Sequence, residues 1–257
     1  MLDVGESLTC CCPIYEGYLL PHAVKVWDGG GTRDLHREFV KRVMERQQHN
    51  GDSTATTAAE SCALPAHRLA MRSLFEQVCC VERQGVFEEA QGQGWPQDLR
   101  GTVQGDGEET VHRLPDGVDI TIGRKERFVV GEALFQPNLM ANQPNMFGGN
   151  AAGVHLNLYQ SILSVDMDMK KSIYQNIVLA GRASLLPGFV ERIEYEVTAL
   201  APPTIEVKAI CVEQRDGPKA AWLGGSILSG SQTFDQMWIS KADYEETGPA
   251  IVERKCF

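Results

Sequence analysis

The sequence lacks any hydrophobic run long enough to cross a membrane, and it is short of basic residues. Its 24 Lys and Arg are outnumbered by 34 Asp and Glu, which gives a formal net charge of −10 at pH 7. This acidic balance argues against binding to nucleic acid or to an anionic membrane, because both attract positive charge. The opening residues, Met1 to Asp3, do not resemble a signal peptide. We therefore expect a cytoplasmic protein with neither nucleic-acid nor membrane partners.

The sequence also lacks the cysteine spacing of a metal site. Eight cysteines are present, but five of them lie in a triplet and an adjacent pair, and none forms a Cys-x-x-Cys motif. Adjacent cysteines on a strand point to opposite faces, which suits neither a zinc knuckle nor a disulfide framework. The six histidines are scattered without ligand spacing. The sequence therefore predicts reduced, buried thiols and no protein-bound metal.

What is present is typical of a globular α/β protein. At 257 residues, with 43% hydrophobic and 23% charged residues, the chain is long enough for one large or two modest domains. Residues 1–4 and 8–12 read as the strands of a hairpin with Gly5 and Glu6 at its tip. A third strand is expected at 23–27, and Asp34 caps a predicted helix. Strand, hairpin, strand and helix open an α/β half-domain.

The rest of the chain predicts alternating helices and strands. We expect helices at 69–81, 160–167, 170–176 and 188–200, a short helix starting at 132–135, and strands at 118–122, 177–179 and 206–212. Residues 91–107 are rich in Gly, Gln and acidic residues, and they read as a surface insertion. The sequence contains no internal repeat.

Residues 222–257 predict a string of short helices. Ser240 suits the N-cap of a helix starting at Lys241, and Asp243 lies where an acid reaches back to the cap. The Gly248-Pro249 pair ends that helix. The segment has too many large apolar side chains to bury by itself, so it must lie on a larger surface.

Residues 222–257, which end in Arg-Lys-Cys-Phe, resemble the C-terminus of actin almost residue for residue. The N-terminal residues Leu2, Asp3 and Gly5, with the stretches 13–18, 20–23 and 33–35, resemble the second phosphate-binding hairpin of actin and the segment next to it. Further anchors lie at 114–117, 132–137, 174–179 and 198–202. The resemblance runs from end to end, with gaps in the loops.

The resemblance implies an α/β fold of the actin-like ATPase, ribonuclease-H-like type, incomplete because only the second half of the actin fold is expected. Residues 1–30 and 151–218 would form the inner sheet subdomain, and 31–150 a helical cap with insertions. Residues 219–257 would be C-terminal helices, a remnant of the outer large subdomain. The first phosphate-binding hairpin would be missing, and a clamp of two opposed hairpins would be reduced to one.

The resemblance also implies a nucleotide site for ATP or ADP with Mg²⁺. Its residues would be Asp3, Gly5, Glu6, Gly31, Arg72, Glu76, Gly181, Arg182 and Lys219. Asp3 is the catalytic candidate, because the matching carboxylate lies near the Mg²⁺ and the attacking water. No direct protein ligand to the metal is expected. The alternative is that Asp3 only caps a strand turn.

Several positions depart from the actin pattern in ways that weaken this site. Ser7 replaces a glycine of the hairpin, and Cys10 replaces the histidine near the attacking water. Phe75 replaces a lysine, which removes a cationic contact but leaves a ring that could stack on a base. Arg182 stands where a second glycine lies against the nucleotide. These changes imply weak or no nucleotide binding and argue against hydrolysis.

The residues that resemble the lining of a partner-binding cleft depart less from the actin pattern than those of the nucleotide site. Tyr15, Gly17, Tyr18, Leu228 and Phe234 resemble the barbed-end cleft of actin, which receives helices of binding proteins or a loop of a neighbouring protomer. Aromatic and aliphatic side chains along a groove suit helix docking. For Phe234, ordinary core packing is the alternative.

The expected function is that of an actin-like structural protein of the cytoskeleton, acting through contacts with actin, actin-binding or actin-related assembly proteins and carrying a degraded nucleotide pocket. One alternative is an enzyme, a nucleotide-dependent actin-like ATPase resting on Asp3, Gly5, Glu76 and Gly181. Another is a partial gene product without an independent role.

Overall fold

The computed structural model describes residues 1–28, 30–49, 65–83, 109–115, 117–140, 152–212 and 219–255. The chain forms two compact units, Met1–Arg215 and Asp216–Phe257, and each is considered by itself. The insertion predicted at 91–107 lies outside the described residues. The predicted three-part division into subdomains stays a prediction.

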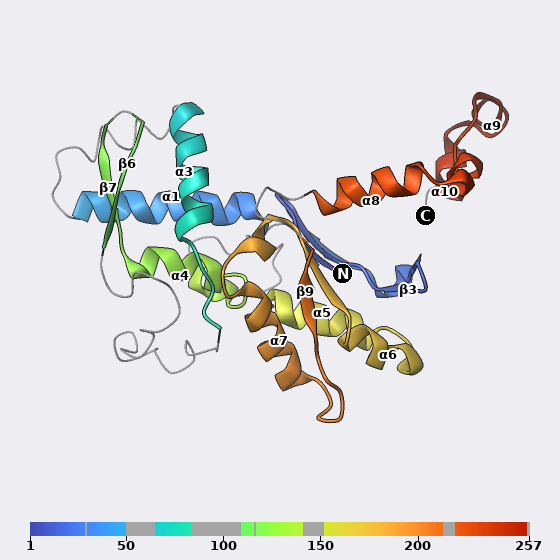
Figure 1. Ribbon diagram of the computed structural model, residues 1–257, viewed down its shortest axis with the longest axis horizontal. Helices are drawn as coiled ribbons and strands as arrows, with labels where there is room; N and C mark the ends of the chain where they lie inside the picture. The colour runs from blue at the N-terminus through green and yellow to red at the C-terminus, as the bar shows by residue number, and fades with distance from the viewer. Residues whose placement is uncertain are drawn as a thin grey trace. The chain divides into compact units, whose positions relative to one another are not determined.

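The first unit is built on a sheet that includes β9 (Figure 1). It has five strands in the order β5-β2-β1-β8-β9. The strands are β1 Leu2–Val4, β2 Leu8–Cys11, β5 Lys25–Asp28, β8 Ile177–Ala180 and β9 Ala209–Cys211. β2 runs antiparallel to both β1 and β5, whereas β8 runs parallel to β1 and β9. The sheet therefore joins strands from the start of the chain to strands about 150 residues or more later, so its pairing is non-local.

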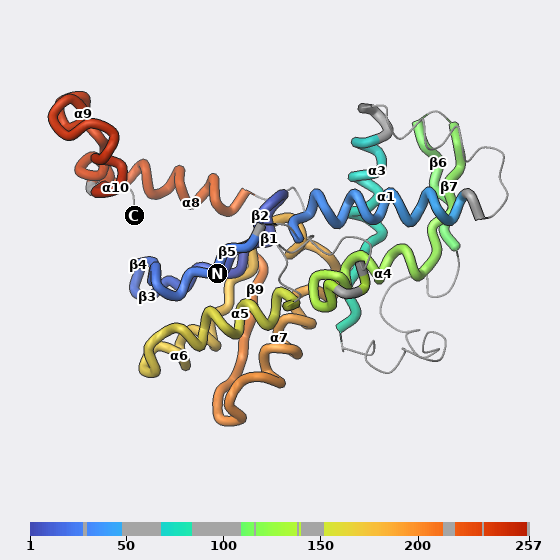
Figure 2. Tube along the Cα trace, turned by 180° about the vertical axis from the view of Figure 1, so that it is seen from behind, coloured from blue at the N-terminus to red at the C-terminus, as the bar shows by residue number. Residues whose placement is uncertain are grey.

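One face of this sheet carries the core. Leu2, Val4 and Leu179 are fully buried, and they alternate with exposed residues such as Val26 and Ile210 on the other face. α5 (Val154–Leu163) packs on β2 and β5, and α7 (Phe189–Leu200) packs on β9 and on α5 (Figures 1 and 2). α6 (Met167–Tyr174) and the 3-10 helix η4 (Arg182–Leu185) complete this region.

A second group of elements surrounds the long helix α1 (Thr32–His49). α3 (Pro65–Val78) crosses α1, and α4 (Arg124–Glu132) and the hairpin β6 (Thr110–Arg113) with β7 (Asp119–Ile122) pack along it (Figure 1). The apolar positions of α1 recur every three to four residues, and the buried side chains are Leu35, Phe39 and Val43. The remaining short elements of this unit are η1 Pro21–Ala23, η3 Pro137–Met140 and the two-stranded pair β3 Ile14–Tyr15 with β4 Tyr18–Leu19.

Most predicted elements of the first unit are confirmed, but several bounds were wrong. α1 begins at Thr32, so Asp34 lies in its first turn and pairs with Arg37 at 3.2 Å instead of capping the helix. The helix expected to start at Glu132 ends there, because α4 begins at Arg124. Strand β6 was missed, because it has only four residues and none of them is buried, so its pairing with β7 leaves little hydrophobic pattern in the sequence.

A buried ion pair fastens α7 to α4. The guanidinium of Arg192 on α7 donates to both carboxylate oxygens of Glu132, at 3.3 and 3.1 Å, and to the carbonyl of Glu82 at 3.0 Å. Glu132 also accepts the backbone N–H of Glu82 at 2.8 Å. Arg192 donates to Glu196 at 2.6 Å and lies 4.9 Å from the centroid of the Phe135 ring. The pair therefore joins α4, α7 and the segment just beyond α3.

The second unit is a chain of short helices, as predicted. They are α8 Ala220–Ser229, η5 Gln232–Gln236, α9 Lys241–Thr247, η6 Gly248–Ala250 and α10 Ile251–Lys255. The predicted capping box is confirmed: the Ser240 hydroxyl accepts from the Asp243 N–H at 3.1 Å, and the Asp243 carboxylate accepts from the Ser240 N–H at 3.0 Å. Gly248 ends α9 with a φ of 70°.

The cysteines whose placement is described all carry thiols outside any disulfide: Cys10, Cys11, Cys12, Cys79, Cys80 and Cys211. The prediction of reduced thiols is thus confirmed for these. Cys11, Cys79 and Cys80 are buried as expected, whereas Cys10, Cys12 and Cys211 are only half-buried, so the prediction of burial was wrong for them. The described residues contain no cluster of three or more His, Cys, Asp or Glu that could hold a metal ion. Within the same residues, no helix has the length and apolar character needed to span a bilayer.

Asp243 provides a test of the second unit. Its pKa is lowered to about 2 because the Lys255 ammonium, first, and Ser240, second, hydrogen-bond to the carboxylate. A carboxyl whose pKa falls on folding stabilises the fold above its unfolded pKa of 3.8, and this contribution is lost as the pH falls through about 2. We expect Lys255→Ala to raise the pKa of Asp243 toward 3.8, as measured by carboxyl-carbon NMR.

The matched control is Lys241→Ala, which removes a lysine that pairs with Glu245 at 3.6 Å on the same helix. This change should leave the titration of Asp243 where it is. An Asp243 that titrates near 3.8 in the unmodified chain would contradict the described contacts.

Candidate functional site

The turn between β1 and β2 is held against the start of α1. The carbonyl of Gly5 accepts from the Thr32 N–H at 2.9 Å and from the Thr32 hydroxyl at 2.8 Å, and the carbonyl of Glu6 accepts from the Arg33 N–H at 2.9 Å. A Cβ on Gly31 would lie 2.5 Å from the carbonyl oxygen of Glu6, so only glycine allows this approach. The predicted residues Gly5 and Gly31 thus contribute through their backbone: Gly5 accepts hydrogen bonds from Thr32, and Gly31 allows the backbone of Glu6 to lie close to the start of α1.

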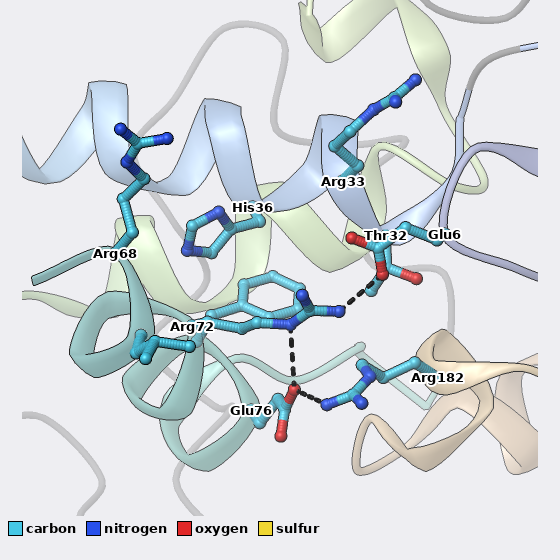
Figure 3. Close-up of a pocket in the computed structure, with 10 residues that line it drawn as sticks. Glu6, Thr32, Arg33, His36, Arg68, Arg72, Glu76 and Arg182 are labelled. Atoms are coloured by element: carbon cyan, nitrogen blue, oxygen red, sulfur yellow. Dashed lines mark hydrogen bonds and ion pairs between the residues drawn. The ribbon is translucent and has the colours of Figure 1, made fainter. Parts of the chain in front are cut away.

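From this turn, a chain of ion pairs runs across three elements (Figure 3). Glu6 pairs with Arg72 of α3 at 2.5 Å, and the Nε of Arg72 lies 3.9 Å from Glu76, one helical turn further on. Glu76 in turn pairs with Arg182, the first residue of η4. Four of the residues predicted from the resemblance therefore converge, although they lie up to 176 positions apart in the sequence.

These ion pairs border a small hollow of about 180 Å³. Its lining consists of the four ion-paired residues with Thr32, Arg33 and His36 of α1 and Arg68, Leu69 and Phe75 of α3. Four arginines and two glutamates are among the lining residues. Figure 3 shows Arg72, Glu76 and Arg182 pointing toward one another, whereas the side chains of Arg33 and Arg68 point away from them.

His36 lies beside this charge cluster, between Arg33 and Arg68 in Figure 3. Its ring makes an edge contact with Phe75, with centroids 6.1 Å apart. The pKa of His36 is lowered, first by burial and then by the guanidinium of Arg72. The imidazole is therefore neutral at pH 7 and adds no further positive charge to the hollow.

Asp3, the middle residue of β1, lies beside Gly181, the residue before Arg182. Asp3 lies opposite Cys10 in β2 and beside Ala180 in β8. Gly181 has a φ of 83°, and a Cβ there would lie 2.3 Å from the Val4 carbonyl oxygen and 2.5 Å from an Asp3 carboxylate oxygen. Burial, first, and then the neighbouring Cys12 and Asp3 raise the pKa of Cys10 to about 12. Cys10 is therefore a neutral thiol next to the candidate carboxylate.

The predicted nucleotide residues, taken as a set, stay a prediction. Glu6, Arg72, Glu76 and Arg182 line the hollow, whereas Asp3 is not among the described residues that do so. Lys219 belongs to the second unit.

Sequence reasoning missed four polar residues of the hollow: Thr32, Arg33, His36 and Arg68. The spacing of four between Arg68, Arg72 and Glu76 was the available signal, because it places the three side chains on one helix face.

The residues predicted for a partner cleft fall on both units. Tyr15 and Tyr18 lie on the hairpin β3–β4, where Tyr18 is 73% exposed and Gly17 forms the turn with a φ of 85°. Leu228 lies on α8, and Phe234 packs edge-on against Trp238 with centroids 5.1 Å apart. Phe234 therefore contributes to packing inside its own unit, and the cleft as a whole stays a prediction.

The comparisons with known proteins agree with the fold. The model of the family described as Actin matches residues 1–257. A protein of Dictyostelium discoideum described as "Putative actin-29" is 33% identical over 259 residues, which cover 100% of this chain and 59% of that protein. The chain thus spans 59% of the length of this curated relative. With its mixed α/β sheet and a family match along the whole sequence, the chain belongs to the actin family.

Proposed function

We propose that the chain is a structural protein of the actin-related cytoskeleton in the cytoplasm, working through contacts with actin, actin-binding or actin-related assembly proteins. The observation that carries this proposal is the surface of α8. None of the residues described in α8 is buried, although the helix carries Trp222, Leu223, Ile227 and Leu228. Contiguous exposed apolar side chains of this size mark a surface that binds another protein.

The size of the charged hollow also supports this proposal, because it argues against nucleotide binding. Ligand sites usually measure roughly 300–1,000 Å³, whereas this hollow measures about 180 Å³, and the charged residues Glu6, Arg72, Glu76 and Arg182 of its lining are paired with one another. As it stands, it does not fit an adenine nucleotide with its Mg²⁺. We derive no step of phosphate chemistry from it, and the proposal is that the nucleotide pocket is degraded.

The second candidate function is that of a nucleotide-binding, actin-like ATPase subunit that takes ATP or ADP with Mg²⁺. The convergence of Glu6, Arg72, Glu76 and Arg182 around one hollow favours it. A specific ligand raises the melting temperature of the protein it binds. Stabilisation of the unmodified chain by saturating Mg·ATP would therefore favour this alternative.

A binding experiment with purified actin tests the first proposal. We expect the unmodified chain to bind fluorescently labelled monomeric actin, and a Trp222→Ser/Ile227→Ser variant to bind at least about tenfold more weakly, a loss of ~1.4 kcal/mol. The physical reason is that large apolar side chains in the centre of an interface carry most of its binding energy. Fluorescence anisotropy, supported by sedimentation velocity, measures the affinity.

The matched control is Met167→Ser on α6, since Met167 is 81% exposed and apolar but lies on the other unit. It should bind actin like the unmodified chain. Equal binding by the α8 variant and the unmodified chain would remove α8 from the interface. Absence of any complex at roughly 100 µM of both proteins would end the proposal for actin itself, since the remaining affinity would be too weak to matter.

A further inference from the structure

Cys10 and Cys12 carry their thiols on the same face of the sheet. The Cys12 thiol donates to the sulfur of Cys10, and the two sulfur atoms lie 3.9 Å apart. Residues two positions apart on a strand share a face, so Cys11 between them points the other way and is only 1% exposed. Cys10 and Cys12 are half-buried. The prediction of no protein-bound metal considered adjacent cysteines and Cys-x-x-Cys motifs, whereas this pair comes from a spacing of two.

The backbone holds both cysteines in place. Cys10 lies inside the sheet, paired with Asp3 of β1 on one side and with Val26 of β5 on the other. The Cys12 N–H donates to the carbonyl of Met1 at 2.8 Å. Pro13 follows, and a residue before proline is restricted to extended backbone. The two sulfur atoms are therefore neighbours before any ligand arrives.

A disulfide does not fit this pair. The sulfur atoms would have to approach to about 2.05 Å, with Cβ atoms roughly 3.5–4.5 Å apart. Residues two positions apart on an extended strand are separated by roughly 6.4–6.8 Å, and their side chains run parallel. Forming the bond would bend β2 away from β1 and β5. An ion between the sulfur atoms needs no such movement, because it keeps them apart.

We propose that Cys10 and Cys12 form a binding site for a soft monovalent metal ion, Cu(I), held between their two sulfur atoms. Each thiol releases its proton to solvent, and each sulfur then donates an electron pair to the ion. Two S–H bonds break and two Cu–S bonds form. No electron is transferred, so copper stays in the +1 state and no oxidant is required.

The number and kind of ligands select this ion. Thiolates are soft ligands, and they favour Cu(I), zinc and iron–sulfur clusters. Zinc takes four ligands in a tetrahedron, and iron–sulfur clusters are held by four cysteines. The described part of the chain has no group of even three His, Cys, Asp or Glu that could hold a metal. Cu(I) is satisfied by two thiolates, so it suits a pair that stands without further ligands of these types.

The test titrates the reduced chain with Cu(I), without oxygen, against the chromophoric chelator bicinchoninate. We expect the unmodified chain to remove Cu(I) from the chelator. Cys10→Ser and Cys12→Ser should each bind the first equivalent at least about tenfold more weakly, because one thiolate remains. Loss of absorbance of the chelator complex measures the affinity. Zn²⁺ should bind equally to the unmodified chain and to Cys10→Ser.

Two control variants separate this pair from the other thiols. Cys11→Val removes the thiol that points to the core, and Cys211→Ser removes a half-buried thiol on β9. Both should bind Cu(I) like the unmodified chain. A loss in Cys11→Val as large as that in Cys12→Ser would contradict a site on one face of the strand. A Zn²⁺ affinity that depends on Cys10 would show that the ion is the wrong one.

A measurement on the unmodified chain covers the case in which a serine variant does not fold, as judged by circular dichroism. Cu(I) should protect Cys10 and Cys12 from alkylation by iodoacetamide, as located by mass spectrometry of peptides, and leave Cys211 as reactive as before. Equal alkylation of Cys10 and Cys12 with and without Cu(I) would overturn the proposal. So would a chain that removes no Cu(I) from bicinchoninate, or one whose affinity is unchanged in both serine variants.

Discussion

An Arg192→Met variant is expected to lose about 3–5 kcal/mol of unfolding free energy. Arg192 is only 1% exposed and Glu132 is fully buried, so removing the guanidinium leaves a carboxylate without its counter-charge inside the protein. The carbonyl of Glu82 also loses its donor. Urea unfolding, monitored by circular dichroism at pH 7, measures the loss from the shift of the midpoint.

The control for this prediction is Arg113→Met, which breaks an exposed ion pair with Asp119 and should change the unfolding free energy by no more than about 0.5 kcal/mol. A small loss in Arg192→Met, similar to that of the control, would show that the buried pair contributes little. A double variant, Arg192→Met with Glu132→Leu, should recover part of the loss, because no buried charge then remains unpaired.

The pH dependence of Arg192→Met gives a second readout. Burial raises the pKa of Glu132 above its ordinary 4.5, and the guanidinium of Arg192 opposes that rise. Removing Arg192 must therefore raise this pKa further. A carboxyl whose pKa is raised on folding costs stability as the pH rises through the folded pKa, and that cost disappears below the unfolded pKa. The deficit relative to the unmodified chain should thus shrink as the pH falls toward 4.5.

A Gly181→Ala variant is expected to lose roughly 2–5 kcal/mol, because two costs add at one position. The φ of 83° disfavours any residue with a Cβ. In addition, the new methyl group would lie 2.3 Å from the Val4 carbonyl oxygen and 2.5 Å from the Asp3 carboxylate, which forces β1 and the end of β8 apart. Chemical unfolding measures the loss of stability.

Gly17→Ala separates the two costs. Gly17 has nearly the same φ, 85°, but a Cβ there meets no atom within 4 Å. This control should lose only about 1–2 kcal/mol, the conformational part alone. Losses of equal size in the two variants would mean that the close approach of Gly181 to β1 adds nothing.

Features of the structure that depend on residues close together along the chain could be predicted from the sequence. Ser240 and Asp243 are three positions apart, so their reciprocal hydrogen bonds result from helix geometry. Gly248 ends α9 for an equally local reason. The family was evident from runs of residue identity, which the match over 1–257 confirms.

The candidate site was predicted only in part, because its residues lie far apart along the chain. The resemblance named Glu6, Arg72, Glu76 and Arg182 one by one, but it could not show that their charges pair with each other. It also suggested that Asp3 shares their site, which stays a prediction; Asp3 lies against Gly181, the residue before Arg182. Arg192 and Glu132 carried no sequence signal, because a buried ion pair between residues 60 positions apart leaves no periodic pattern.

By itself, the sequence determined the family, most of the helices and strands, the reduced thiols among the described cysteines and the local cap of α9 in the second unit. Those properties depend on residue identity and on contacts between residues a few positions apart, so they can be derived from the sequence of the segment alone. Only the tertiary structure decided that Glu6, Arg72, Glu76 and Arg182 pair with one another beside the hollow, and that a buried ion pair joins α4 to α7. Such contacts require distant segments to be brought together by packing of the whole core, and no local pattern encodes that arrangement.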